Sequence, residues 1–415
     1  MYIICTNGTP TVNMLDHLPP LPLFVDCGHT SLTLTVQDEL GIYHALRLHD
    51  RVYHINLNLS PSILRKVIAL MDQHFPILEH LSLSLSSTAT TPPPLTLPEA
   101  FLAPKLRHLA LPSIRPLRRL QLLTSIISLA TLELSNIEAS SYFNPSLLVE
   151  RLLFLPQLRK LSIAFSTLIP HPSTESELSG EQGVPVTLPS LKILQFKGVG
   201  AYLESLLAQI KVPLLERLCI SLFHETIFAL PHLSYLIDIT EAFKLPKAAV
   251  GFDRNEVYVT ALHYNSEWFE WGPFLFRVIC KPLDWKIDRA AQICSALIPT
   301  LSCVEQLTLY HNYREITTEL RSGAINSARW HDLLRSFIGI KRLYIDITLD
   351  NALLEELSHA LQLDEVGSDP GFLPNLLFII ARGPRSRSIS ARHDLFTSFI
   401  HTRQVVARPI QVSSW

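Results

Sequence analysis

A short phrase, apolar-Pro-x-Leu, recurs along this chain, and such repetition constrains the fold more than any other feature of the sequence. Most copies continue into the pattern L-x-x-L-x-L, as at Leu78, Leu81 and Leu83. The same triplet without the proline starts at 52, 129, 304 and 340. Six copies of the phrase, among others, span 75–78, 103–106, 155–158, 188–191, 212–215 and 373–376.

Each triplet predicts a β-strand, because side chains alternate with a period of two along a strand and the leucines then point to one side. Proline lacks a backbone donor and fits just before a strand better than inside it. From residue 52 to residue 215 the triplets start 23 to 33 residues apart, and this spacing together with the pattern is typical of leucine-rich repeats. The turn asparagine of many such repeats occurs only once, at Asn312, so divergent turns are expected.

Helices are predicted where the apolar period changes to 3.6 residues. Ser60 and Pro61 form an N-cap followed by a proline at the first helical position, and an apolar stripe begins at Ile63. Similar stripes occupy 202–210, 290–297, 330–337 and 353–361.

The pattern predicts an α/β fold, a leucine-rich-repeat solenoid or horseshoe, with a parallel concave sheet and irregular helices and loops on the convex side. We expect an N-terminal extended capping segment over 1–50, the solenoid over 51–380, and a C-terminal Arg-containing helical or extended cap over 381–415. The stretches 86–98 and 170–185 are rich in Pro, Ser, Thr and Gly and predict exposed insertions.

One part of the array is irregular. The triplets at 215 and 304 lie 89 residues apart, which is too long for one repeat. Alternating residues predict strands at 257–261 and 274–278, and Leu230-Pro231 begins a further copy of the phrase. We therefore expect about three irregular repeats in this region.

The outward positions of the strands form two rows, because neighbouring strands lie about 4.8 Å apart. Solenoids of this type bind partners on the concave face, so these rows are the candidate binding surface. The candidates are His54, His80, His108, Lys160, Arg217, Gln306 and Arg342 in the first row and Asn56, Ser82, Glu133, Gln195 and Tyr344 in the second. The two rows predict a mostly polar concave sheet.

The three histidines allow two interpretations. Three imidazoles on adjacent strands resist being charged together, which would make binding depend on pH. Alternatively, they are ordinary polar residues of the concave face, and we favour this interpretation. No carboxylate or thiolate of the neighbouring rows completes a ligand set, so no metal site is predicted.

Catalysis has no support in the motifs. The sequence contains no G-x-S-x-G, G-x-G-x-x-G or P-loop, and His331-Asp332 and His393-Asp394 fall in predicted helices without a partner serine or cysteine. We therefore expect a protein that is not an enzyme and has no cofactor. Trp268, Trp271 and Trp285, with the phenylalanines at 269, 274 and 276, are interpreted as core packing, or alternatively as a binding hot spot.

Composition narrows the partners and the compartment. A formal net charge of −2, from 35 basic and 37 acidic residues, argues against a nucleic acid as the binding partner. No apolar run is long enough for a membrane span, and MYIICTNGTP lacks the basic region of a secretion signal. Six scattered cysteines suit free thiols in the cytoplasm or nucleus. The stretch 382–408 holds six arginines against one acidic residue, which predicts a solvated end, or alternatively a contact for acidic partners or a nuclear address.

Several phrases together resemble the fungal F-box-like leucine-rich-repeat proteins of mushroom-forming basidiomycetes. The resemblance covers nearly the whole chain. It implies the substrate-recognition repeats of an SCF-type ubiquitin ligase, in which a helical F-box binds the linker subunit. The phrases are HLPPLPLFVDCG (17–28), DELGIYHALRLHDRVYHINL (38–57), FPILEHLSLS (75–84), FLAPKLRHLAL (101–111), LLERLCISLF (214–223) and VGSDPGFLPNL (366–376).

The chain departs from this family before its first repeat. Only 51 residues precede Val52, and they are extended and proline-rich rather than F-box-like. We therefore expect that the F-box is lost or lies upstream of Met1, and that the linker subunit binds only if an F-box is present. The alternative is a stand-alone repeat scaffold, or a truncated relative without a ligase role.

Overall fold

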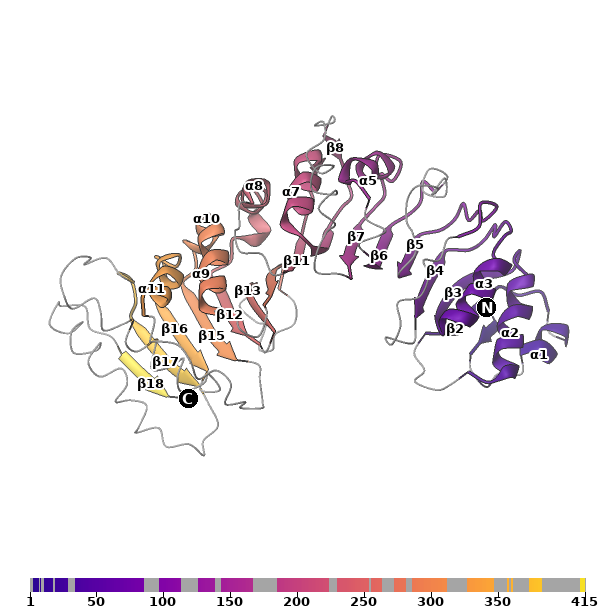
Figure 1. Cartoon of the computed structure of the whole chain (residues 1–415), viewed down its shortest axis with the longest axis horizontal. Helices are drawn as coiled ribbons and strands as arrows, with labels where there is room; N and C mark the ends of the chain where they lie inside the picture. The colour runs from indigo at the N-terminus through magenta and orange to yellow at the C-terminus, as the bar shows by residue number, and fades with distance from the viewer. Residues whose placement is uncertain are drawn as a thin grey trace. The chain divides into compact units, whose positions relative to one another are not determined.

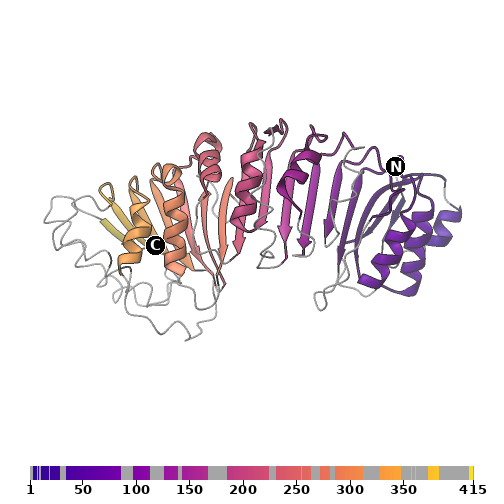
Figure 2. The same ribbon diagram turned by 45° about the horizontal axis from the view of Figure 1, so that its top comes forward.

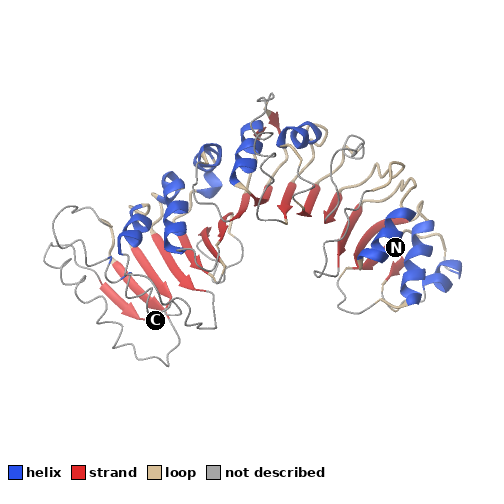
Figure 3. Cartoon of the chain, in the orientation of Figure 1, coloured by secondary structure: helices blue, strands red, loops and turns tan. Residues whose placement is uncertain are grey.

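The structure is a computed structural model of the whole chain and comprises two compact units, Met1–Leu215 and Glu216–Trp415 (Figure 1). Each unit combines a sheet with helices on one side of it (Figure 3). We call the opposite side of the sheet the strand face. The structure describes residues 3–6, 8, 11–17, 19–28, 34–85, 97–112, 126–138, 143–166, 185–223, 230–253, 255–262, 272–280, 286–311, 327–346, 357, 360, 373–382 and 411–414.

The sheet of the first unit is parallel, with the order β1-β2-β3-β4-β5-β6-β7-β9. Its strands lie side by side in two views (Figures 1 and 2). A second small sheet pairs β8 with β10. The strands are β1 (Ile3–Cys5), β2 (Leu23–Cys27), β3 (Val52–Leu59), β4 (His80–Leu85), β5 (His108–Pro112), β6 (Thr131–Ile137), β7 (Lys160–Phe165), β8 (Val186–Thr187), β9 (Ile193–Gly198) and β10 (Ile210–Lys211).

Helices join several of these strands, as a parallel sheet requires. The helix predicted at Ser60-Pro61 is confirmed: Ser60 is the N-cap, Pro61 is in the first turn, and Leu64 and Val67 are buried. The stripe at 202–210 corresponds to α7. The helices of this unit are α1 (Thr11–His17), α2 (Val36–Arg47), α3 (Pro61–Leu70), α5 (Pro145–Leu152) and α7 (Gly200–Gln209).

The N-terminal 50 residues differ from the expected extended segment. They contain two helices, α1 and α2, and two strands that continue the parallel sheet, with Val25 paired to Ile55. Thr35 and Asp38 form a capping box that starts α2. The sequence did not reveal these strands, because the apolar-Pro-x-Leu copy at 18–21 does not continue into L-x-x-L-x-L. A capping role for this segment stays a prediction.

The repeated leucines form the core of the sheet. Leu81, Leu109, Leu132 and Leu161 occupy equivalent positions on β4 to β7 and are fully buried. Each therefore packs against the next along the array, and each buried leucine removes enough apolar surface from water to contribute about 2 kcal/mol.

In the turns, other polar groups form the hydrogen bonds that an asparagine ladder would form. The Ser128 hydroxyl donates to the carbonyl oxygen of Pro104 at 3.3 Å, and the Ser190 hydroxyl donates to that of Pro156 at 2.8 Å. Each bond joins one repeat to the preceding one, next to the proline phrase. Carbonyl groups that a turn leaves without a backbone partner are thereby satisfied.

The second unit has the strand order β11-β14-β13-β12-β15-β16-β17-β18. Its strands are β11 (Arg217–Phe223), β12 (Lys247–Phe252), β13 (Glu256–Leu262), β14 (Phe274–Ile279), β15 (Gln306–His311), β16 (Arg342–Asp346), β17 (Phe378–Arg382) and β18 (Gln411–Ser414). Its helices are α8 (Pro231–Ile239), the 3-10 turn η2 (Glu241–Phe243), α9 (Lys286–Ala296), α10 (Ile298–Leu301) and α11 (Ser327–Arg335). The stripes predicted at 290–297 and 330–337 correspond to α9 and α11.

The irregular region is not a set of three repeats. Its three strands occur in reverse order along the sheet, and β13 runs antiparallel to both β12 and β14. Only residues 253–255 join β12 to β13, which is too short for a parallel crossover and forces a hairpin. The copy of the phrase at Leu230-Pro231 begins the helix α8, with its proline in the first turn. The sheet of the second unit is therefore parallel, as expected, except for β13.

Several predictions fall wholly or mostly outside the described residues. These are the insertions 86–98 and 170–185, the helix at 353–361, and most of 381–415. In the last stretch, Gln411–Ser414 forms β18, which pairs in parallel with β17. Its role as a cap stays a prediction.

Candidate functional site

The strand face of the first unit carries the first predicted row in unbroken register. His54 pairs with His80, and His80 pairs with His108. The row continues through Thr131 to Lys160. It also extends in the other direction to Phe24 and Ile4. The sequence did not predict these two positions, because β1 and β2 lack the L-x-x-L-x-L pattern. The alternation of Leu23, Val25 and Cys27 was the available signal.

Four rings of this row stack in parallel, and we call Phe24, His54, His80 and His108 the ring ladder. The centroids of Phe24 and His54 are 3.7 Å apart with an interplanar angle of 8°. The next two steps measure 4.0 Å each, with angles of 9° and 1°. Rings on adjacent parallel strands are brought this close by the strand spacing of about 4.8 Å. The ladder therefore fixes four planar side chains in one orientation.

Burial keeps the histidines of the ladder neutral. It lowers the pKa of His54 to about 4, although Asp26 opposes the shift, and it lowers the pKa of His80 to about 3 with help from the neighbouring histidines. The pKa of His108 is lowered by burial as well. His54 Nε2 is buried without a hydrogen-bond partner among the described residues. These directions argue against the hypothesis that the ladder tunes binding near neutral pH.

The second row of this unit consists mainly of polar groups and paired charges. The Asn56 amide donates to Asp26 at 2.9 Å. Lys160, in the first row, forms an ion pair with Glu133 at 2.6 Å. Ser82 and Gln195 occupy equivalent positions on β4 and β9. Beside the ladder, the strand face is therefore polar, as predicted, and its charges are largely compensated.

The first row of the second unit contains cations. Lys247 pairs with Gln306, Gln306 pairs with Arg342, and Arg342 pairs with Phe378. The Arg342 guanidinium lies over the Phe378 ring, 6.0 Å from its centroid. Arg217 stands at the corresponding position of β11 and is exposed. The structure thus brings Gln306 and Arg342 together as predicted and adds Lys247.

The centre of this second strand face is apolar, in contrast to the polar surface expected. Tyr258, Leu275 and Tyr310 form a buried cluster with Ala249, and Cys219 packs against it. The Tyr258 and Tyr310 rings meet edge to face, 5.4 Å between centroids. Burial raises the pKa of Tyr258 to about 12 and also raises that of Tyr310. The sequence does not predict this cluster, because the strand order that assembles it is not local.

The second row continues beside that cluster. Thr308 pairs with Tyr344, which is half-buried. Tyr344 therefore lies on the strand face of β16, as predicted, close to Arg342 on the same strand.

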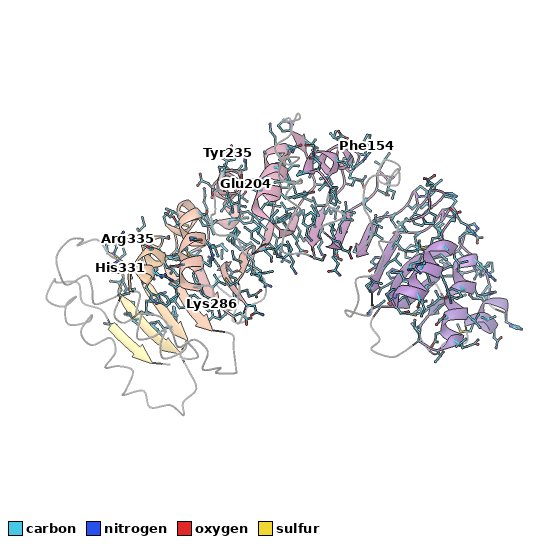
Figure 4. The ribbon with its side chains drawn as sticks, viewed as in Figure 1. Phe154, Glu204, Tyr235, Lys286, His331 and Arg335 are labelled. Atoms are coloured by element: carbon cyan, nitrogen blue, oxygen red, sulfur yellow. The ribbon has the colours of Figure 1, made fainter. Side chains whose placement is uncertain are left out.

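The described residues show no cluster of histidine, cysteine or carboxylate groups suited to a metal ion. His331 lies on α11 and its Nε2 is 3.0 Å from the Ala360 carbonyl oxygen, while Asp332 is exposed; Figure 4 shows His331 on this helix, away from the strands. The pair His393-Asp394 lies outside the described residues.

The aromatic group near residue 270 is described only in part. Phe274 and Phe276 are buried in the core, as in the packing interpretation. The tryptophans at 268, 271 and 285 and Phe269 lie outside the described residues. In the described part of the chain, no helix has both the length and the apolar character needed to cross a membrane.

These features define the class of protein: the chain is a leucine-rich-repeat solenoid of the α/β class, as the register of its leucine-bearing parallel strands shows. No protein-family model and no curated protein matches the sequence. Among solved structures, the chain is similar to a leucine-rich repeat-containing protein of Legionella pneumophila, LegL7, with 13% identity, a TM-score of 0.30, and coverage of 96% of this chain and 98% of that one.

Proposed function

We propose that the protein is a binding module that engages another protein through its strand faces. The observation that supports this most is the register of the ring ladder, which sets four planar side chains in one fixed row on a rigid sheet. Side chains already ordered before binding lose little entropy when a partner arrives. Parallel sheets of repeat proteins commonly serve as extended binding surfaces of this kind.

The chemistry of the first strand face supports recognition rather than catalysis. Its histidines are held neutral by burial, and its carboxylate Glu133 is paired with Lys160. A general base or nucleophile requires a group poised to exchange a proton with substrate. The site instead offers flat rings and short polar groups, which suit contact with a protein surface.

A matched pair of substitutions tests this proposal. Ala110 lies on the strand face between Ser82 and Glu133, whereas Ala69 is exposed on α3. Ala110→Arg places a long charged side chain across the strand face, and Ala69→Arg places it on the helix side. Quantitative affinity capture should show partners that bind the wild type and the Ala69→Arg variant but not the Ala110→Arg variant. Equal losses in both variants, or none in either, would contradict the proposal.

We further propose, from the resemblance to fungal F-box-like proteins, that this module is the substrate-recognition region of an SCF-type ubiquitin ligase receptor. The alternative is a stand-alone scaffold without a ligase role. A pull-down with the SCF linker subunit, using the product of the full-length transcript, distinguishes the two. Failure of that product to associate with the linker subunit rejects the ligase role and leaves the scaffold.

The cysteines support a reducing compartment. None of the six forms a disulfide, and four of them are buried. Buried free thiols persist in the cytoplasm and nucleus, where disulfides are rare. We therefore place the module in one of these two compartments, and imaging of a tagged full-length protein tests this.

A further inference from the structure

The recurring proline phrase forms a β-turn at the start of the strands. In five copies of the first unit, the backbone N–H of the last residue donates to the carbonyl oxygen of the first residue, at 3.1 to 3.4 Å. The proline is therefore the second residue of the turn, a position that its fixed φ angle favours. The first and last residues of each copy are buried, and the two between them are partly or fully exposed. The copies are 75–78, 103–106, 155–158, 188–191 and 212–215.

The turns stack on one another along one margin of the parallel sheet. The Arg107 backbone N–H donates to the carbonyl oxygen of Glu79 at 2.8 Å, and each following turn repeats this bond with the turn before it as far as Lys192. The turn at 212–215 is joined to the series by the Leu188 N–H, which donates to the carbonyl oxygen of Lys211 at 2.8 Å. Backbone bonds at every step hold the margin rigid. We call residues 102–107, 126–130, 153–159, 188–192 and 211–215 the turn ridge.

The turn ridge exposes large apolar side chains. Of the eight exposed large apolar side chains among the described residues of the first unit, five belong to it, each between 46% and 63% exposed. Figure 4 shows one of them, Phe154, at the outer margin of the unit, away from the strands. An exposed apolar strip of this kind marks a contact with a protein or a membrane. The five are Leu102, Ile127, Leu153, Phe154 and Leu214, and exposed prolines accompany them at 104, 156, 189 and 213.

The charged side chains of the turn ridge are all cations. Acidic side chains close to it in the sequence, Glu79, Glu99, Glu150 and Glu216, lie outside the ridge, and Glu79 is paired with Arg107 at 3.5 Å. The ridge is therefore positive in a chain whose net charge is −2. Its cations are Lys105, Arg107, Arg159, Lys192 and Lys211.

We propose that the turn ridge binds the surface of an anionic lipid bilayer. Apolar side chains that enter the boundary between headgroups and acyl chains, beside Lys and Arg that face anionic headgroups, are the combination that holds proteins on a membrane surface. The charge of the ridge complements such a surface. A nucleic acid fits less well, because Phe154 is the single aromatic side chain of the ridge and bases bind by stacking on several exposed rings.

Flotation of the full chain with lipid vesicles tests the proposal. Vesicles with about one third phosphatidylserine in phosphatidylcholine should carry the protein upward, and pure phosphatidylcholine vesicles should carry far less. Added salt should weaken binding to the anionic vesicles. Lys105→Gln and Arg159→Gln should each lower the partition coefficient about fivefold. Ile127→Gln and Leu214→Gln should each lower it about five- to tenfold, because they remove apolar surface that the bilayer buries.

Two exposed positions outside the ridge supply matched controls. Leu40 on α2 is 50% exposed, and Arg65 is exposed on α3. Leu40→Gln and Arg65→Gln make the same chemical changes in the same unit and should alter the partition coefficient less than about twofold. All the replaced side chains are exposed, so thermal unfolding should be unchanged and a loss of binding is not a loss of fold.

The proposal fails if anionic vesicles do not bind the protein, if neutral vesicles bind it equally, or if the control variants lose as much binding as the ridge variants. If Ile127→Gln abolishes capture of a protein partner and vesicles do not bind the wild type, the ridge is a protein contact instead. The inference concerns the margin of the sheet and does not rest on the function proposed for the strand face. Loss of partners in Ala110→Arg with unchanged vesicle binding would separate the two surfaces.

Discussion

The imidazole rings of His80 and His108 lie parallel on neighbouring strands, with their centroids 4.0 Å apart and an interplanar angle of 1°. Each ring excludes water from the other, and the resulting burial lowers the pKa of both. Two charged rings at this distance would also repel each other. The folded state therefore requires the stacked rings to be neutral, so protonation of the rings destabilises it.

We expect the free energy of unfolding to fall as the pH drops from about 6.5, where unfolded histidines begin to bind protons. The loss continues to about pH 4, the folded pKa of His54, and further for His80. The sign follows because the folded state binds fewer protons than the unfolded state in this window. The rings are half-exposed, so solvent screening limits the effect to about 1 kcal/mol for each ring.

Urea unfolding across this pH range measures the effect. Replacing His54, His80 and His108 together with glutamine should remove the part of the pH dependence that the ladder causes, whereas His232→Gln, at an exposed position of α8, should not. The same pH dependence in the triple variant and the wild type would show that the ladder is not responsible. If the ladder is the only titrating group involved, the affinity for a partner should be the same at about pH 5.5 and at about pH 7.5.

The sequence predicts the register of the histidines in this ladder but not their lowered pKa values. The L-x-x-L-x-L spacing fixes the register of His54, His80 and His108, because the leucines must point into the core. The lowered pKa values depend on how far neighbouring rings exclude water, which is a property of packing. Phe24 completes the ladder from a strand that lacks the L-x-x-L-x-L pattern.

The second strand face was less predictable. The residues of β12 to β14 alternate as strands do, so their presence was expected, but nothing local states that their order along the sheet is reversed. The short connection at 253–255 decides the direction of β13. As a consequence, Tyr258 meets Tyr310, and Lys247 joins the row of Gln306 and Arg342.

The repeated core positions should carry large stability effects. Leu132 is fully buried and pairs in register with Leu109 and Leu161. Leu132→Ala should lower the free energy of unfolding by about 2 to 5 kcal/mol, since it removes apolar contacts and leaves a cavity. Ile127→Ala, at a position 63% exposed in the preceding turn, should change it by less than about 0.5 kcal/mol. Chemical denaturation measures the free energy of unfolding of both variants. Similar losses would mean that burial does not determine how much each position contributes to stability.

The capping box of α2 should matter for the N-terminal part of the first unit. The Thr35 hydroxyl accepts from the Asp38 backbone N–H at 3.2 Å, and the Asp38 carboxylate accepts from the Thr35 backbone N–H at 2.9 Å. Thr35→Ala should cost about 1 kcal/mol in unfolding free energy, because it leaves helix donors without a partner. Val36→Ala, one residue on and 75% exposed, is the control. Amide hydrogen exchange should show faster opening of α2 in Thr35→Ala only, and unchanged protection would contradict a role for the cap.

The pair Gly251 and Tyr258 tests how the reversed strands are packed. The two residues are opposite each other on antiparallel strands, and a Cβ at position 251 would lie 2.3 Å from the Cζ atom of Tyr258. Gly251→Ala should therefore destabilise the protein by about 1 to 3 kcal/mol through overpacking. Tyr258→Ala removes the ring and should be destabilising for a different reason, the loss of the contact with Tyr310.

A double-mutant cycle separates these causes. If the glycine is needed because the tyrosine ring covers it, Gly251→Ala should cost little in the Tyr258→Ala background, because the clash is gone. The two losses would then sum to clearly more than the loss in the double variant. Additive losses would instead mean that the glycine acts through the backbone alone, and the ring would have no part in holding β12 against β13.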